Sequence, residues 1–303
     1  MLMNTKQHIN GWLILDKPQG MGSTDAVNFT RRFFHAFKNG HAGTLDPFAT
    51  GVLPIAFGEA TKIIPFVTDG DKIYEFTLKF GISTNTDDIE GAVIQSCGHI
   101  PSKEDILNIL PAFLGHITQT PPPYCAVKIN GERAYKLARE GKSFEVPKRQ
   151  VFIESLEFLE QISADSFRFK VKCSKGTYVR SLGRDIALKL NTFGHLTALR
   201  RTKCGFFSIE DTILLENLKN MVYEVDRQDF LLPIQTPLRD IAALALSAED
   251  AVKLRLGQGL SVKKYALQQN VGQTMVAYLG DCLTALVRID ENKISPIRVF
   301  NFE

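Results

Sequence analysis

The chain of 303 residues is expected to fold as an α+β protein, with a mixed, mostly antiparallel sheet, flanking helices and a small β-rich C-terminal domain. Residues 72–80 and 166–173 alternate apolar and polar side chains, which is the period of a strand with one buried face. Residues 23–37 place apolar side chains on one face of a helix, and residues 177–190 are also expected to be helical. After about residue 240, short strand-like runs dominate. Strands and helices mixed in this way are typical of the α+β class.

The first part of the chain is expected to alternate short strands with helices. Ser23 or Thr24 can cap the first helix, and Pro65 is expected to weaken the end of the second. The acidic run at 84–91 has the composition of a solvated turn. The expected elements are, in order, a strand at 11–15, a turn at 16–20, a helix at 23–37, a loop at 39–50, a strand at 51–58, a helix at 59–67, a strand at 72–80 and a loop at 84–91.

The rest of the chain divides at about residue 240, so we expect one domain at 1–239 and a second at 240–303. Pro111 weakens the end of one helix, and three consecutive prolines at 121–123 exclude regular structure there. The expected elements are a helix at 103–114, an Asn-Gly turn at 130–131, a short helix at 134–140, strands at 152–158 and 166–173, a helix at 177–190, and strands at 196–207, 275–280, 283–289 and 296–300.

Cysteine usage and hydropathy point to a reduced, cytoplasmic protein. The five cysteines are scattered, with no C-x-x-C pair, which argues against both a disulfide framework and a zinc site. The histidines likewise lack metal-ligand spacing, so no metal is expected. The first ten residues hold no signal-peptide core, and no apolar run approaches the roughly 20 residues of a membrane span.

Positive charge gathers in two stretches of an otherwise nearly neutral chain. Residues 168–203 hold ten lysines and arginines and one acid, Asp185. Residues 126–150 hold seven against three acids, with Tyr124 and Tyr135 nearby. Cations serve phosphates, and aromatic rings stack on splayed bases. The alternative is a solvated face without a partner, but two such stretches favour a nucleic acid.

The segment GHAGTLDPFATGVLP at 40–54 is unusual for a loop. Its glycines allow tight or left-handed backbone, and Asp46 precedes Pro47, which disfavours helix at Asp46. A strand follows at once, so the carboxylate is expected at the lip of a sheet, where catalytic groups are often presented. On spacing alone, an aspartate that only organises the loop is the simpler interpretation.

Five segments in order resemble the motifs of the TruB-type pseudouridine synthases, which convert a uridine in the T-loop of tRNA to pseudouridine. The loop with Asp46 resembles their catalytic loop. The other four segments are LDKPQGMGST (15–24), KIYEF (72–76), QTPPPYCAVKINGERAYKLAREG (119–141) and CSKGTYVRSLGRDIA (173–187). The resemblance implies the pseudouridine synthase fold for 1–239, with an RNA-gripping insertion at about 119–150. It implies a PUA-like RNA-binding domain for 240–303.

By this resemblance Asp46 is the catalytic nucleophile, and the uridine at position 55 is the target. Whether the carboxylate attacks the sugar or the base stays open, although the mechanism favoured for the family passes through a sugar-derived glycal. Arg180 matches the aspartate's partner. With Thr177 as the expected N-cap, Arg180 falls in a first helical turn, where a cation is disfavoured unless an anion lies close. We expect this pairing to lower the aspartate's pKa by roughly 1–3 units.

The resemblance also implies roles for the residues around the pocket. Tyr74 matches the tyrosine that stacks on the target base and can serve as a base toward the sugar, and Tyr178 matches a second pocket tyrosine. His41 matches a histidine that fills the space of the flipped base. Lys17 is expected to support the catalytic loop, and Leu199 lies in a pocket-lining strand. Four cations are expected to contact phosphates, with surface charges as the alternative: Lys128, Lys136, Arg200 and Arg201.

The sequence lacks the glycine-rich nucleotide fingerprints, and the implied isomerisation is redox-neutral, so no cofactor is expected. We expect a monomer that acts on the tRNA T-arm without a protein partner. One alternative is a glycoside-cleaving enzyme, whose second carboxylate would come from Asp87, Asp88 or Glu90. The other is a non-catalytic tRNA-binding or tRNA-folding protein with the same fold.

Overall fold

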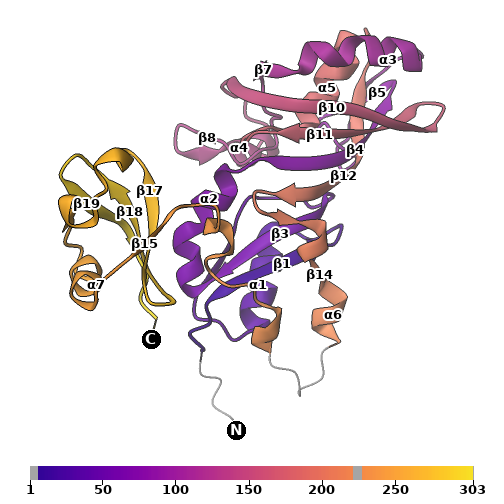
Figure 1. The fold of residues 1–303 in the computed structure, drawn as a ribbon. Coiled ribbons are helices and arrows are strands. Elements are labelled where there is room, and N and C mark those ends of the chain that lie inside the picture. The colour runs from indigo at the N-terminus through magenta and orange to yellow at the C-terminus, as the bar shows by residue number, and fades with distance from the viewer. Residues whose placement is uncertain (1–5, 221–226, 303) are drawn as a thin grey trace.

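The computed structural model of the chain describes residues 6–220 and 227–302. It has the expected α+β architecture, with one large mixed sheet, flanking helices and a separate small sheet near the C-terminus (Figure 1). In the described part of the chain, none of the helices has the length and apolar character needed to cross a membrane.

The large sheet has ten strands in the order β14-β1-β3-β12-β4-β11-β10-β7, with β2 paired to β3 and β13 paired to β12. Only the β1–β14 and β3–β12 pairs are parallel, so the expectation of a mostly antiparallel sheet is confirmed. Its strands are β1 (Gly11–Lys17), β2 (Asn39–His41), β3 (Thr50–Phe57), β4 (Lys72–Phe80), β7 (Gly115–Gln119), β10 (Arg149–Ser163), β11 (Ser166–Cys173), β12 (Gly194–Cys204), β13 (Phe207–Ser208) and β14 (Ile213–Leu214).

The helices pack along this sheet and around its edges. They are α1 (Ser23–Phe33), α2 (Ile64–Asp69), α3 (Lys103–Ile109), α4 (Ala134–Arg139), α5 (Val179–Lys189) and α6 (Leu215–Lys219). Two hairpins stand apart from the sheet, one of β5 (Ile82–Thr84) with β6 (Val93–Ser96) and one of β8 (Lys128–Ile129) with β9 (Glu132–Arg133). The second hairpin and α4 form the insertion between β7 and β10 (Figure 1).

Several expected helix ends are wrong, each for a local reason. Gly22 is the N-cap of α1, and Ser23 instead exchanges hydrogen bonds with the backbone of Leu45. The helix stops at Phe33, and His35 has a positive φ of 49°. The helix expected at 59–67 begins as a 3₁₀ turn, and Pro65 stands at the start of α2 rather than at its end, where a missing N–H costs least.

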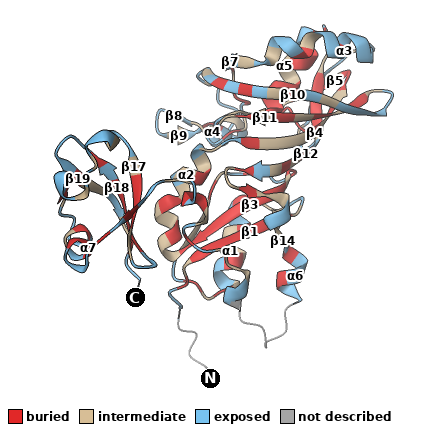
Figure 2. Cartoon of the chain, viewed as in Figure 1, coloured by how far each residue is buried: buried red, intermediate tan, exposed pale blue. Residues whose placement is uncertain are grey.

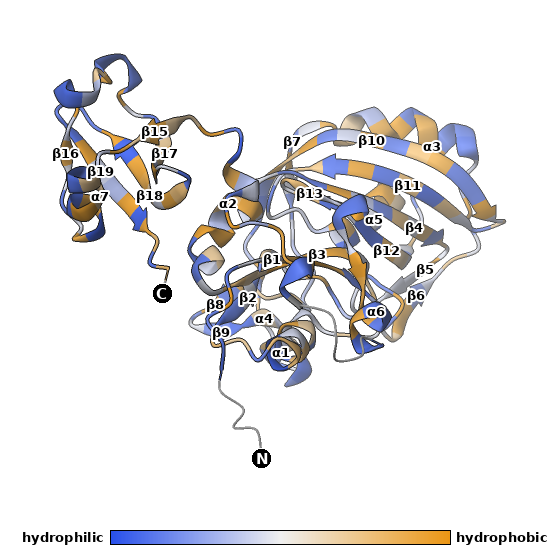
Figure 3. Ribbon diagram, turned by 60° about the horizontal axis from the view of Figure 1, so that its bottom comes forward, coloured by the Kyte–Doolittle hydropathy of each residue, from blue (hydrophilic) through white to orange (hydrophobic). Residues whose placement is uncertain are grey.

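Both faces of the central strands are covered, which explains why β3 is apolar along almost its whole length. One face packs against α1, α3 and α5 in a core that includes Phe76 and Phe169. The opposite face packs around Trp12 and Phe207, together with Phe300 from the C-terminal end of the chain. Figure 2 shows this buried centre, and Figure 3 shows the alternation of polar and apolar residues along β10 and β11.

The small sheet has five strands in the order β15-β17-β18-β19-β16 and carries the helix α7 (Ala248–Arg255). Two polar contacts join it to the large sheet's α2 side: Lys62 donates to the carbonyl of Val299 at 2.8 Å, and the N–H of Asn301 donates to Glu59 at 2.7 Å. Its strands are β15 (Ala243–Ala245), β16 (Leu260–Ser261), β17 (Thr274–Leu279), β18 (Cys282–Ile289) and β19 (Lys293–Val299).

Candidate active site

The loop that carries Asp46 runs between β2 and β3, and the side chain of Arg201 on β12 holds its backbone. Arg201 is only 1% exposed, and its guanidinium donates to the carbonyls of Val52 at 2.8 Å, Gly43 at 3.0 Å and Thr44 at 3.4 Å. The strand after the loop passes so close that a Cβ at Gly51 would lie 2.2 Å from the Arg201 carbonyl oxygen. Arg201 therefore lies inside the fold, which corrects its expected place among the surface cations.

A second buried cation, Lys17 at the end of β1, fixes the other side of the loop. Its ammonium donates to the carbonyls of Pro18 at 2.9 Å, Met21 at 2.7 Å and Pro47 at 3.2 Å. Burial lowers the pKa of Lys17 to about 8, although the carboxylate of Asp46 favours the charged form. Because Pro47 follows Asp46 directly, Lys17 restrains the backbone that carries the carboxylate, in agreement with the supporting role expected for it.

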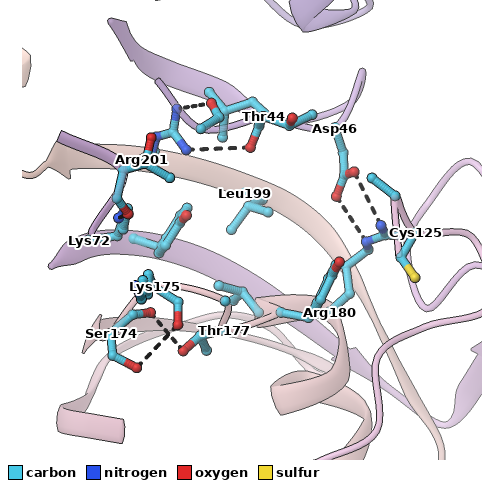
Figure 4. A pocket seen from close by; sticks show the side chains of 18 residues that line it. Thr44, Asp46, Lys72, Cys125, Ser174, Lys175, Thr177, Arg180, Leu199 and Arg201 are labelled. Carbon is cyan, nitrogen blue, oxygen red and sulfur yellow. Dashed lines mark hydrogen bonds and ion pairs between the residues drawn. The ribbon is translucent and has the colours of Figure 1, made fainter. Parts of the chain in front are cut away.

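The structure brings Asp46 and Arg180 together, 134 residues apart in the chain (Figure 4). The Arg180 Nε lies 2.9 Å from Oδ2 of Asp46, and its Nη2 donates to Oδ1 at 3.2 Å. The side chain of Arg180 is 4% exposed, whereas that of Asp46 is 34% exposed. The arginine is thus a buried support, and the carboxylate is the member of the pair that a ligand can reach.

The electrostatics of this pair differ from the expectation. Burial raises the pKa of Asp46, and the neighbouring carboxylate of Asp88 adds to the rise, while Arg180 and Lys17 oppose it. The expected lowering by Arg180 exists but is outweighed by the loss of solvation. The carboxylate of Asp46 is therefore partly desolvated, although its side chain stays 34% exposed and within reach of a ligand.

Asp88 is a buried partner of Arg180 that the sequence did not reveal. The acidic turn at 84–91 was expected to be solvated, yet Asp88 is 3% exposed and accepts from Nη1 of Arg180 at 3.2 Å. Its other oxygen accepts from the Thr86 hydroxyl at 2.6 Å, and the Thr86 carbonyl accepts from Arg180 at 2.9 Å. Arg184 binds the adjacent Asp87 at 2.8 Å. The signal was indirect: two arginines four residues apart on a half-buried helix need carboxylate partners from elsewhere.

A cavity of about 250 Å³ opens beside the carboxylate of Asp46. Tyr74 of β4 and Tyr178 contribute its rings. Leu199 of β12 contributes an apolar wall (Figure 4). Burial raises the pKa of each of these tyrosines to about 12, so both are phenols at neutral pH. Tyr178, not Thr177, is the N-cap of α5, which leaves Arg180 in the first turn as expected.

His41 lies on β2 and is partly buried, unlike an exposed loop histidine. Among the described residues, those that line the cavity do not include it. Its Nδ1 is buried without a hydrogen-bond partner in the described part of the chain, and burial lowers its pKa, helped by the charge of Arg201. A neutral imidazole near the catalytic loop is the result.

The stretch 168–203 is not the basic surface that its composition suggests. Besides the two buried arginines, several of its cations pair with acids from other strands, such as Arg168 with Glu75 at 2.5 Å and Lys172 with Glu154 at 2.6 Å. Arg200 is 39% exposed and binds Asp16 at 2.6 Å. Local composition overstated the charge because the partners lie far away in the sequence.

The insertion keeps its cations in solvent. Lys128 is exposed on β8, and Lys136 on α4 is 56% exposed while it lies 3.4 Å from Glu132 and 3.9 Å from Glu140. Exposed pairs of this kind hold the side chain only weakly. Lys136 can therefore exchange these partners for a phosphate, and Lys128 is exposed to one directly.

Two family models match the chain. The model of the TruB family pseudouridylate synthase (N terminal domain) matches residues 31–179, and that of the tRNA pseudouridylate synthase B C-terminal domain matches residues 180–239. Their junction falls inside α5, between strands of the same sheet. The matched segments together include both Asp46 and Arg180.

The chain is also similar to curated and solved proteins. It is 46% identical to tRNA pseudouridine synthase B of Caulobacter vibrioides over 298 residues, 96% of each chain. It is 49% identical to tRNA pseudouridine synthase B of Gluconacetobacter diazotrophicus over 255 residues, 84% of this chain and 83% of the relative. A crystal structure of a Cbf5-Nop10-Gar1 complex matches with a TM-score of 0.73 at 25% identity, over 97% of this chain and 85% of that one.

Proposed function

The chain belongs to the TruB family of tRNA pseudouridine synthases, and on that premise we propose that it isomerises the uridine at position 55 in the tRNA T-loop, with Asp46 as nucleophile. The observation that supports the proposal most is the reachable carboxylate of Asp46, held by the buried guanidinium of Arg180 at the edge of a cavity. An anion that is held in a fixed orientation and can still reach a ligand suits nucleophilic catalysis.

The reaction breaks the bond between uracil N1 and the sugar C1′, turns the base, and joins its C5 to the same C1′. N1 gains a proton and C5 loses one, so the product is an isomer of the substrate, and neither a donor nor an oxidant is consumed. A carboxylate oxygen of Asp46 can open this sequence by attack on the sugar or on the base, and it is released when the new bond is complete.

Arg180 orients the attacking oxygen and offsets the cost of burying its charge. The fork of a guanidinium fixes both carboxylate oxygens in one plane, which an ammonium group cannot do. Because Asp88 and the Thr86 carbonyl hold the other side of the guanidinium, Arg180 keeps this orientation before a substrate arrives. Preorganisation of this kind lowers the barrier, since little needs to move in the transition state.

The cavity accepts a nucleoside that has left the RNA stack. Extrusion costs a few kcal/mol, which stacking on an aromatic ring partly offsets. We assign that stacking to Tyr74, with Tyr178 and Leu199 as further walls. Because burial raises the pKa of Tyr74 to about 12, this side chain is a neutral phenol before substrate binds. We therefore assign it stacking and hydrogen bonding rather than the role of a general base. His41, neutral and near the loop, is assigned to the space that the base leaves behind.

The T-arm is held outside the cavity by the insertion and the neighbouring surface. We assign phosphate contacts to Lys128, Lys136 and Arg200, whose side chains reach solvent. Arg201 is instead assigned to the support of the catalytic loop. We further propose that residues 240–303 form a PUA-like domain that adds RNA contacts, and that the chain works as a cytoplasmic monomer without a cofactor or a protein partner.

A direct assay tests the proposal. The purified chain is incubated with a T-arm stem-loop that carries the target uridine, and pseudouridine is quantified after digestion to nucleosides. We expect product from this hairpin and from full-length tRNA, and none when the uridine at position 55 alone is replaced by cytidine. Absence of product from both RNAs, despite binding, would leave a tRNA-binding or tRNA-folding protein as the function.

A further inference from the structure

A buried amide lies between the RNA-gripping insertion and the catalytic helix. Gln119 is the last residue of β7, the edge strand that leads into the insertion, and its side chain is 0% exposed. Its Oε1 accepts from the N–H of Tyr178 at 2.8 Å, and its Nε2 donates to the carbonyl of Tyr178 at 3.0 Å. The side chain of Gln119 therefore pairs with both the N–H and the carbonyl of Tyr178, as the backbone of a neighbouring β-strand would.

Tyr178 is a sensitive place for such a contact. It is the N-cap of α5 with an extended backbone (φ −99°, ψ 108°), and its own side chain makes no capping hydrogen bond. Its ring lines the cavity beside Asp46, and Arg180 follows two residues later in the first turn. A shift of this backbone moves a wall of the base pocket and the guanidinium together.

We propose that Gln119 is a positioning residue of the isomerisation: its amide fixes the Tyr178 backbone and so sets the places of the pocket ring and of Arg180. Gln119 does not line the cavity itself, so it acts only through these two residues. The inference rests on the proposed function and deepens it.

The neighbouring contact between Ser181 and Thr120 provides a comparison, because it joins the same two elements without holding a pocket residue. Ser181 is also 0% exposed, and its hydroxyl donates to the carbonyl of Thr120 at 2.8 Å. It joins the same helix to the same start of the insertion, but it holds no residue of the pocket. The same carbonyl also accepts from Arg184 at 2.9 Å, so loss of the Ser181 hydroxyl leaves it bonded.

The test compares Gln119→Leu with Ser181→Ala on the T-arm hairpin, in the full chain. For Gln119→Leu we expect the single-turnover rate at saturating RNA to fall about 10²-fold, because small displacements of reacting groups cost that much. The Kd for the hairpin is expected to change less than about threefold, since the insertion keeps its cations. Ser181→Ala is expected to keep its rate within about threefold of the parent.

The variant Gln119→Glu adds a second measurement, the pH dependence of the rate, which should not change if Gln119 served stability alone. Its ionised carboxylate can accept from the Tyr178 N–H but repels the Tyr178 carbonyl, whereas the protonated acid restores the donor. The ratio of its rate to that of the parent is therefore expected to rise from about pH 8 to about pH 5.5, because the buried acid at position 119 takes up a proton over this range. Dividing by the parental rate removes the part of the Asp46 titration that both proteins share. The corresponding ratio for Gln119→Leu is expected to stay flat.

Thermal unfolding of each variant is measured alongside, so that rates refer to folded protein. A rate for Gln119→Leu within threefold of the parent, or equal losses in Gln119→Leu and Ser181→Ala, would overturn the inference. If Gln119→Leu does not fold, the pH ratio of Gln119→Glu decides, and a flat ratio overturns the inference. An inactive parent chain would instead refute the proposed function.

Discussion

The first turn of α5 and the insertion at 119–150 both carry cations, but they place them differently. Arg180 is buried, with its guanidinium shared among two carboxylates and two backbone carbonyls. Lys136 on the insertion lies in solvent, beside exposed glutamates. A buried charged side chain is held in one orientation, and removal of one of its partners destabilises the protein. An exposed charged side chain is mobile, and salt screens its interactions. We infer that the buried first turn of the helix sets the rate of the chemistry and that the exposed lysines of the insertion contribute to the affinity for RNA.

The largest effect is expected on the buried side of this comparison. In Arg180→Lys the ammonium cannot hold Asp46, Asp88 and two carbonyls at once. We expect the single-turnover rate to fall by about 10²–10³-fold, as when a preorganised donor is removed. The hairpin Kd is expected to stay close to that of the parent in a filter-binding measurement. An equal loss in rate and affinity would mean that Arg180 serves RNA binding after all.

Asp88→Asn tests the buried site one step further from the substrate, because Asp88 contacts Arg180 and does not line the cavity. The substitution replaces the ionised acceptor of the Arg180 guanidinium by a neutral one, which holds it more weakly, so we expect the rate to fall about tenfold. It also removes a negative charge that raises the pKa of Asp46, so the acid limb of the pH–rate profile should move to lower pH. Asp87→Asn is the matched control, since Asp87 binds Arg184 instead of Arg180. Equal profiles for both variants would contradict the assignment.

The pH dependence of the parent tests the electrostatics of the buried site. Burial raises the pKa of Asp46. In the proposed mechanism the nucleophile is its ionised form. As pH falls through this raised pKa, the ionised fraction and the rate should fall together, by about tenfold per unit below it. The midpoint should lie above the ordinary aspartate value of about 3.9. A midpoint below that value would show that Arg180 outweighs burial. Circular dichroism at each pH separates this effect from unfolding.

The smallest effects are expected in the insertion. Lys128→Ala should weaken hairpin binding by only a few-fold and reduce the slope of log K against log salt by about 1. Lys136→Ala should act less strongly, because Lys136 already shares its charge with Glu132 and Glu140. Saturating rates should stay unchanged for both. A large drop in the saturating rate would show that these two lysines also take part in the chemistry.

The strands could be predicted because their signals are local. Alternation placed β4 at Lys72–Phe80 as the structure has it. The Asp46–Pro47 pair indicated only a non-helical loop, and it was the resemblance to a known family that gave Asp46 a catalytic role. The cation in the first turn of α5 indicated a nearby anion, and Asp46 lies there. These signals need only the side-chain period or the conformational limits of a few adjacent residues.

The burial of charge could not be predicted in the same way. Asp88 and Arg180 are 92 residues apart, and nothing within the acidic turn distinguishes a solvated loop from one folded onto a guanidinium. Arg201 looked like a surface cation because its partners are backbone carbonyls of the distant loop. The pKa of Asp46 depends on how much solvent the assembled cavity excludes, which no local pattern encodes.

The central claim is that the carboxylate of Asp46 performs the chemistry while other residues hold the RNA. Asp46→Asn keeps the size of the side chain and removes the nucleophile. On the T-arm hairpin we expect a Kd within about threefold of the parent and a pseudouridine yield reduced by at least about 10⁴-fold in single turnover. Formation of pseudouridine by the folded variant at the parental rate would contradict the account.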